Sequence, residues 1–157
     1  MTRLVRILVF AIPFAAAAAL ALSAAATTPQ ALRIDMVGHL TGPSTAAGTW
    51  TSSGLVTDAG TYTETFRFAG DTIHGEKLLV GHGGTLVLRV QAVVAWIDAC
   101  TATFKAGSWQ IAGGTGGYQS FAGGGEPAAE PSSFGNVCTG QIRIAHAGRA
   151  HTEENGG

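Results

Sequence analysis

The sequence predicts an all-β protein, an eight-stranded antiparallel β-barrel, preceded by an amino-terminal signal peptide. Three observations support this fold class. Stretches of alternating apolar and polar residues recur along the chain, Gly-containing turns separate them, and no long stretch has helical periodicity. Even spacing with short connections favours a meander that closes on itself, because closure removes the exposed sheet edges. A β-sandwich is the alternative architecture.

The first residues have the pattern of a cleavable export signal. Arg3 and Arg6 form a cationic start, residues 7–26 carry no charge, and the stretch ends on alanines 24–26. This small-residue ending predicts cleavage after Ala26, and hence a protein that is secreted or lies on the exterior of the cell envelope. An uncleaved membrane anchor is the alternative, because about 20 apolar residues can span a bilayer. After cleavage we expect no stable membrane span.

The first half of the mature chain contains four predicted strands. Ile34 and Met36 alternate with charged residues, and farther along aromatic residues alternate with threonines. A period of two is typical of strands that bury one face. The four ranges are 33–40, 48–57, 61–68 and 72–80, of which the second and fourth have the weaker patterns.

Four more strands are predicted in the second half, at residues 85–97, 101–111, 118–124 and 137–147. In the first of these, Leu86 and Leu88 share one face with further apolar residues. Residues 126–136 contain two prolines and are predicted to form a surface loop. Residues 151–157 are polar and are predicted to form a disordered tail. The barrel domain is therefore expected to cover residues 27–150.

The charge of the mature chain excludes one class of partner. Without Arg3 and Arg6, seven Lys and Arg residues stand against ten Asp and Glu residues. A net charge near −3 offers no basic surface for nucleic acid or for an anionic membrane. About 131 residues can still bury a sizeable core in one domain.

Cys100 and Cys138 are the only cysteines in the sequence. In an exported protein, a lone pair predicts a disulfide rather than a metal site or free thiols. If a third strand separates the strands that begin at these residues, their Cα atoms would lie about 10 Å apart, too far for the bond. The disulfide therefore requires that the intervening strand be short or displaced, or that Cys138 reach across from the incoming loop.

The Gly-rich stretch at residues 108–125 does not match a phosphate-binding loop. Gly114-Thr115-Gly116 is followed by Gln119, where a dinucleotide fingerprint needs its third glycine. The next segment is predicted to be a strand, so no helix N-terminus would face a phosphate.

The same stretch resembles the strand, Gly-Thr-Gly turn, aromatic residue and closing glycines of the allene oxide cyclase and dirigent β-barrel families, as found in small exported bacterial proteins. The matching structural motif consists of Trp109, Ile111, Gly113, Gly114, Thr115, Gly116, Tyr118 and Gly123. The resemblance implies the barrel fold and self-association into a homo-oligomer. It implies no catalytic residue, because dirigent proteins have Ala-Arg-Gly where this chain has Phe121-Ala122-Gly123. Residues 33–40 also lack the acidic and Asn-containing signature of plant cyclases.

Glu64 is the candidate catalytic residue. It lies between Tyr62 and Phe66 on a strand face that is otherwise apolar. If that face points into the barrel, burial raises the pKa of the carboxyl group, which would then suit a general acid or base. Alternatively, the strand is inverted, or Glu64 lies in water at the barrel mouth. Tyr62, Glu64 and Phe66 are also candidate ligand-binding residues.

The histidines do not predict a metal site. The spacings of His39, His74, His82 and His146 match no compact metal pattern, and we expect neither a metal nor another cofactor. His146 shares a strand face with two isoleucines and is the fourth candidate ligand-binding residue. The three tryptophans are expected in the core or at its rim.

Three functions are compatible with these patterns. The first is non-catalytic binding of a small, mostly apolar organic molecule in the lumen, and we favour it. The second is a cofactor-independent cyclase, isomerase or coupling-steering protein that acts by confinement. The third is a structural module on the cell surface. A buried acid that faces an open cavity would favour catalysis, whereas a side-chain-filled barrel without a cavity would favour a non-catalytic binding or structural role.

Overall fold

The computed structural model describes residues 28–126 and 133–153. The predicted signal peptide and residues 154–157 of the predicted tail lie outside these ranges. Within them, no helix is long and apolar enough to cross a membrane.

The described chain is almost entirely strand, in agreement with the predicted fold class. One short 3-10 turn, η1, interrupts the strands. The elements are β1 (Gln30–Gly42), β2 (Thr45–Gly54), β3 (Asp58–Ala69), β4 (Thr72–Gly81), β5 (Gly84–Trp96), β6 (Thr101–Gly114), η1 (Gly116–Tyr118), β7 (Phe121–Gly125), β8 (Phe134–Asn136) and β9 (Gln141–Thr152).

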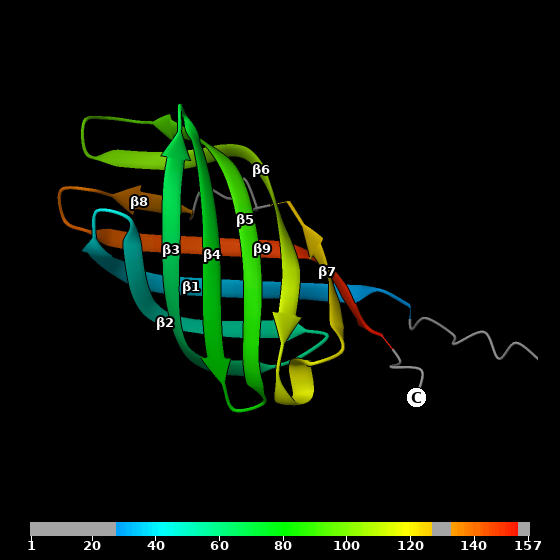
Figure 1. Ribbon diagram of the computed structural model, residues 1–157. Coiled ribbons are helices and arrows are strands. Elements are labelled where there is room, and N and C mark those ends of the chain that lie inside the picture. The colour runs from blue at the N-terminus through cyan, green and yellow to red at the C-terminus, as the bar shows by residue number, and fades with distance from the viewer. Residues whose placement is uncertain (1–27, 127–132, 154–157) are drawn as a thin grey trace, which may run out of the picture.

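The strands close into an antiparallel barrel with eight strand positions (Figure 1). Strands β1 to β6 are joined in order as hairpins, and β9 returns to pair with β1 from Gln30↔Ala150 to His39↔Gln141. The eighth position, between β6 and β9, is shared by two short strands. β7 occupies it near one end, and β8 occupies it near the other. The predicted eight-stranded barrel is confirmed, and the sandwich alternative is wrong.

The predicted surface loop over residues 126–136 is wrong at its carboxyl-terminal end. There Phe134–Asn136 forms β8, which pairs with both β6 and β9. Three residues are too few to produce an alternating pattern, so the sequence contains no usable signal for this strand. Residues 127–132 lie outside the described ranges.

A turn follows β8 where the sequence predicts a strand from Val137 onward. The Asn136 side-chain oxygen accepts hydrogen bonds from the backbone N–H groups of Cys138 (3.1 Å) and Thr139 (2.9 Å). This local hydrogen bonding competes with strand pairing, as is typical of Asn. The strand β9 therefore begins only at Gln141.

Other strand boundaries also differ from the prediction, and two of these differences change the interpretation of a segment. Tyr118 was expected to start a strand but belongs to η1, and β7 begins at Phe121. The tail predicted from His151 starts too early, because β9 continues to Thr152, which pairs with Phe121. Pairing with β7 satisfies backbone groups that a free tail would leave to water.

Alternate residues of each strand form the core, as the sequence pattern predicts. In β1, Ile34 and Met36 are wholly buried, whereas Val37 on the other face is 51% exposed. Two tryptophans, Trp50 and Trp109, are also buried in this core. Closure of the sheet places all these inner faces around one interior.

The split eighth position explains how the disulfide forms. Because β8 pairs directly with β6, Thr101 lies opposite Asn136, and the two cysteines flank this pair. Their Cα atoms are 5.3 Å apart, and Cys100 and Cys138 are bonded. The strand expected between them, β7, does not extend to this end of the barrel. The separation of about 10 Å expected across an intervening strand therefore does not apply.

At the opposite end of the barrel, the Asp58 carboxylate connects three separate segments. It accepts hydrogen bonds from the backbone N–H groups of Ala59, His82 and Gly83, from the His82 ring and from the Tyr118 hydroxyl. These bonds, with that from Tyr118 the strongest cause, hold the pKa of Asp58 well below its usual range. Burial and the Asp58 carboxylate together raise the pKa of Tyr118.

The Gly-rich motif provides the room that this arrangement needs. Gly116 has a φ of +60°, and a Cβ atom on Gly114 would lie 2.5 Å from the backbone oxygen of Tyr118. The Tyr118 side chain, 2% exposed, packs beneath the turn as the sequence pattern suggests. Thr115 adds a hydroxyl contact of 2.7 Å to Thr85.

Removal of the disulfide is expected to lower the free energy of unfolding by about 4 kcal/mol, because it closes a loop of 38 residues in the unfolded chain. Urea unfolding of the oxidised protein and of a Cys100→Ala/Cys138→Ala variant measures this difference. Equal midpoints for the two proteins would show that the bond does not stabilise the fold.

Asp58 is expected to make the barrel sensitive to acid. Because its pKa is depressed in the folded state, its contribution is complete above the unfolded pKa of about 4 and is lost as pH falls below that value. Asp58→Asn should melt at a lower temperature than wild type at pH 7, with a smaller difference at pH 2. Melting followed by circular dichroism tests this, with Asp71→Asn as the control. A melting difference that is independent of pH would contradict the assignment.

Candidate functional site

The barrel encloses a cavity of about 150 Å³ that reaches the surface near the disulfide. Its walls are mainly apolar and come from strands on all sides of the barrel. They include Phe66, Val90, Val94, Phe104, Ile142 and Ile144. Apolar cavities of about this size hold a benzene-sized molecule. The lumen is therefore open, although it is small.

The outer part of the cavity is bordered by exposed apolar side chains. Phe68, Trp96 and Val137 line it and are 54%, 57% and 51% exposed, respectively. They come from the ends of β3 and β5 and from the turn after β8. A ligand that enters here would meet a mainly apolar entrance before it reaches the buried polar groups.

Three polar side chains line the inner part of the cavity: Glu64, Lys77 and His146, which we call the lumen cluster. They come from β3, β4 and β9, and their exposed fractions are 6%, 1% and 1%. Glu64 therefore points into the barrel, as the main sequence interpretation holds. An inverted strand or a solvated position at the mouth does not describe it.

Glu64 and Lys77 form a buried ion pair. Their residues lie opposite one another in the β3–β4 register, and Oε2 of Glu64 is 2.5 Å from Nζ of Lys77. Gly75 leaves the room for the carboxylate, because a Cβ atom there would lie 2.7 Å from Oε1 of Glu64. Burial lowers the pKa of Lys77, and the charge and hydrogen bond of Glu64 oppose this shift.

Lys77 is not among the site residues that the sequence predicts. A signal for it existed, since Lys77 falls on the same alternating face as Ile73 and Leu79 in the predicted strand at residues 72–80. A charged residue on an apolar face often marks a buried partner, but pairing with Glu64 depends on the register between two strands. That register is not encoded in either strand alone.

His146 is buried, and among the described residues neither of its ring nitrogens has a hydrogen-bond partner. Its ring lies 5.8 Å from that of Trp109, whose own N–H donates to the Ala147 backbone oxygen at 3.1 Å. Burial, followed by the charge of Lys77, lowers the pKa of His146 well below its usual range. The ring is thus a neutral imidazole with one donor and one acceptor free, an arrangement that costs about 1–3 kcal/mol when no partner is bound.

Tyr62 lies on the predicted face but does not line the cavity. Its side chain is 1% exposed, and its hydroxyl has no hydrogen-bond partner. The hydroxyl sits over Gly38, where a Cβ atom would approach it to 2.5 Å. Burial, with a smaller effect of Glu64, raises the pKa of Tyr62 to about 12. Of the four candidate ligand-binding residues, the structure brings Glu64, Phe66 and His146 to the cavity.

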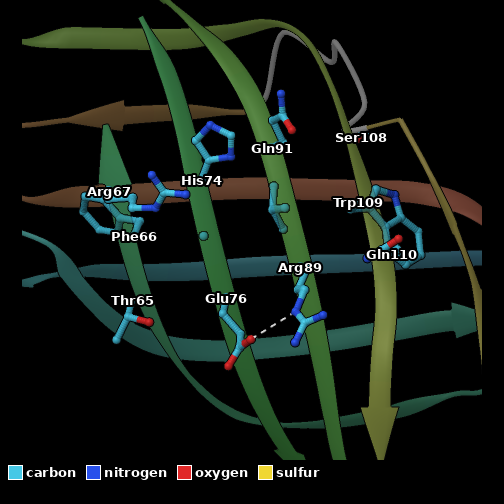
Figure 2. A pocket seen from close by; sticks show the side chains of 12 residues that line it. Thr65, Phe66, Arg67, His74, Glu76, Arg89, Gln91, Ser108, Trp109 and Gln110 are labelled. Atoms are coloured by element: carbon cyan, nitrogen blue, oxygen red, sulfur yellow. Dashed lines mark hydrogen bonds and ion pairs between the residues drawn. The ribbon is translucent and has the colours of Figure 1, made fainter. Parts of the chain in front are cut away.

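A second depression, of about 620 Å³, lies over strands β3 to β6, is open, and is lined by both polar and apolar residues (Figure 2). Figure 2 shows Glu76 and Arg89 joined across β4 and β5. The two side chains are 3.3 Å apart, and both are more than half exposed. Exposed pairs of this kind contribute little energy to binding or folding. His74 lines this depression and is therefore separate from the lumen cluster.

The other two histidines that were considered as metal ligands, His39 and His82, also lie away from the cavity. His39 is exposed on β1, and His82 is 88% exposed and hydrogen-bonded to Asp58. Among the described residues, no three His, Cys, Asp or Glu side chains gather into a group that could hold a metal ion.

No protein-family model, curated protein or solved structure matches the chain. The likeness to allene oxide cyclase and dirigent barrels thus stays a hypothesis that rests on the Gly-rich motif. The function must be argued from the cavity itself.

The ion pair is expected to behave as a unit in mutational tests. Lys77→Met should lower the free energy of unfolding by about 3–5 kcal/mol, because it leaves a buried carboxylate uncompensated. Glu64→Leu should have a similar effect, and the double variant should be much more stable than the sum of the single changes predicts. Urea unfolding of the four proteins forms a double-mutant cycle. Additive losses would mean that the two side chains do not interact.

Proposed function

We propose that this barrel binds a small, mostly apolar organic molecule in its lumen and does not catalyse its conversion to a product. The observation that carries the proposal is the cavity of about 150 Å³ with apolar walls and a cluster of buried polar groups at its inner end. Ligand sites in proteins are typically apolar cavities with a few polar groups that fix orientation. The lumen has both features.

The size of the cavity limits the ligand. Sites for drug-sized molecules usually measure about 300–1,000 Å³, whereas this cavity matches a single six-membered ring. The apolar entrance formed by Phe68, Trp96 and Val137 favours the same class of molecule. A monocyclic hydrocarbon such as toluene is therefore a suitable probe.

A cofactor-independent cyclase or isomerase is the second candidate, and Glu64 supports it. The carboxylate is buried and lines the cavity, as a general acid or base would. It is also held by Lys77 at 2.5 Å, so it exchanges protons with that amine and with atoms bonded to the amine rather than with a free ligand. Binding without catalysis is for this reason the better supported of the two.

A purely structural role on the cell surface has less support. A barrel with no ligand gains stability when side chains fill its interior, because voids forfeit packing contacts. Here the interior holds a cavity and an imidazole without hydrogen bonds. We further propose that the protein works outside the cytoplasm, since an oxidising compartment would maintain the Cys100–Cys138 bond.

Toluene is expected to bind to the mature protein and to raise its melting temperature. Val94→Phe, which places a ring in the cavity, should weaken binding by about ten-fold or more, since it removes the volume that the ligand needs. Val37→Phe, on the exposed face of β1, is the matched control and should bind toluene as wild type does. Chemical-shift titration by NMR measures the three affinities. Failure of wild type to bind toluene, or equal binding by both variants, would refute binding in the lumen.

A further inference from the structure

We propose that Lys77 is a carbonyl-trapping amine, which forms an imine with small aldehydes or ketones that enter the lumen. This inference rests on the proposed function, because the carbonyl compound must first occupy the cavity. It adds a chemical class of ligand and a covalent mode of capture.

The position of Lys77 carries the inference. Its side chain is 1% exposed, yet it lines a cavity that reaches the surface. Within the described residues, the Glu64 carboxylate is the one polar group that contacts Nζ, although an ammonium group has three donors. Tyr62 lies farther away, with Nζ 6.0 Å from the centre of its ring. Nζ is thus both enclosed and open to a molecule in the lumen.

Stability alone does not account for the ion pair. Two charges taken out of water gain little over well-packed apolar residues of similar volume. Glu64 and Lys77 face an apolar cavity rather than a network of further hydrogen bonds. Strongly perturbed ionisable groups in a cleft are often functional, and here the geometry identifies a reactive amine.

Burial also makes the neutral amine easier to reach. It lowers the pKa of Lys77, although Glu64 acts in the opposite direction. Transfer of one proton from the ammonium group to the Glu64 carboxylate gives a neutral pair, which a low-dielectric lumen favours over separated charges. A lysine that is desolvated in this way is a nucleophile for carbonyl compounds.

The reaction balances without any other reagent. The Nζ lone pair attacks the carbonyl carbon, and one N–H proton passes from the attacking nitrogen to the carbonyl oxygen to give a neutral carbinolamine. The C–O bond then breaks as the Glu64 carboxylic acid donates its proton to the departing hydroxyl, which leaves as water. The nitrogen lone pair forms the C=N bond, and the remaining N–H proton passes to the Glu64 carboxylate. One amine and one carbonyl thus give one imine and one water.

His146 lines the same cavity and can form hydrogen bonds with the carbonyl compound. Both of its ring nitrogens lack partners, and the ring lies close enough to Lys77 for the lysine charge to lower its pKa. A neutral imidazole offers one N–H donor to a carbonyl oxygen and one acceptor to the hydroxyl of a carbinolamine. An apolar ligand without oxygen would leave these groups unsatisfied.

The sequence makes the experiment unusually clean, because the whole chain has two lysines, Lys77 and Lys105. Lys105 is exposed on β6 and provides an internal control in the same molecule. The mature protein is incubated with benzaldehyde and sodium cyanoborohydride, which reduces an imine to a stable secondary amine. Peptide mass spectrometry then gives the rate of benzyl addition at each lysine and at the amino terminus.

We expect benzaldehyde to label Lys77 at least about ten-fold faster than Lys105, because the cavity concentrates and orients the aldehyde beside the amine. Pyrenecarboxaldehyde is too large for the cavity and should label Lys105 but not Lys77. Val94→Phe should slow benzaldehyde labelling of Lys77 and leave that of Lys105 unchanged. Glu64→Gln should slow labelling of Lys77 even where toluene binding is retained.

The outcomes separate the two proposals. If toluene binds but Lys77 is labelled no faster than Lys105, imine formation is overturned and lumen binding stands. If pyrenecarboxaldehyde labels Lys77 as fast as benzaldehyde does, reaction through the cavity is overturned. If toluene does not bind, the proposed function itself fails. The comparison of two lysines within wild type decides the question even if a variant does not fold.

Discussion

The pairing of β9 with β1 is the constraint on which the rest of the structure depends. It runs from Gln30↔Ala150 to His39↔Gln141 and joins the two ends of the sheet. A closed sheet has one inner face, so every residue of one parity on each strand must point to the same small interior. Glu64 and Lys77 already face one another across the β3–β4 hairpin, and closure brings His146 of β9 into the same interior.

The sequence predicts which residues of one strand share a face, because that pattern is local. It does not predict which residues pair across two strands, because pairing depends on the register between them. The alternation in residues 33–40 and 61–68 is a local property. It groups Ile34 with Met36, and Glu64 with Tyr62, and the structure places these faces inside. The partner of Glu64 is set by the register between β3 and β4, which no single strand encodes. Lys77 was missed for that reason, although its own alternation with apolar neighbours pointed inward.

The other misses have related causes. β8 is too short to show a period, and the Asn136 turn that delays β9 depends on one side chain that bonds to nearby backbone. Asp58 was missed because its donors come from the β4–β5 turn and from η1, segments that only folding brings near β3. The hydrogen bonds that the Asp58 carboxylate accepts stabilise the fold. The lumen instead keeps the His146 ring nitrogens without partners, which adds nothing to stability and leaves room for chemistry.

The position of the disulfide determines how firmly the entrance to the lumen is held. Val137 borders the cavity and directly precedes Cys138, and Trp96 borders it a few residues before Cys100. The disulfide thus connects two sides of the entrance as well as two neighbouring segments of the barrel. A reduced chain would lack this brace, so the side chains at the entrance to the lumen would be held less firmly than in the oxidised protein.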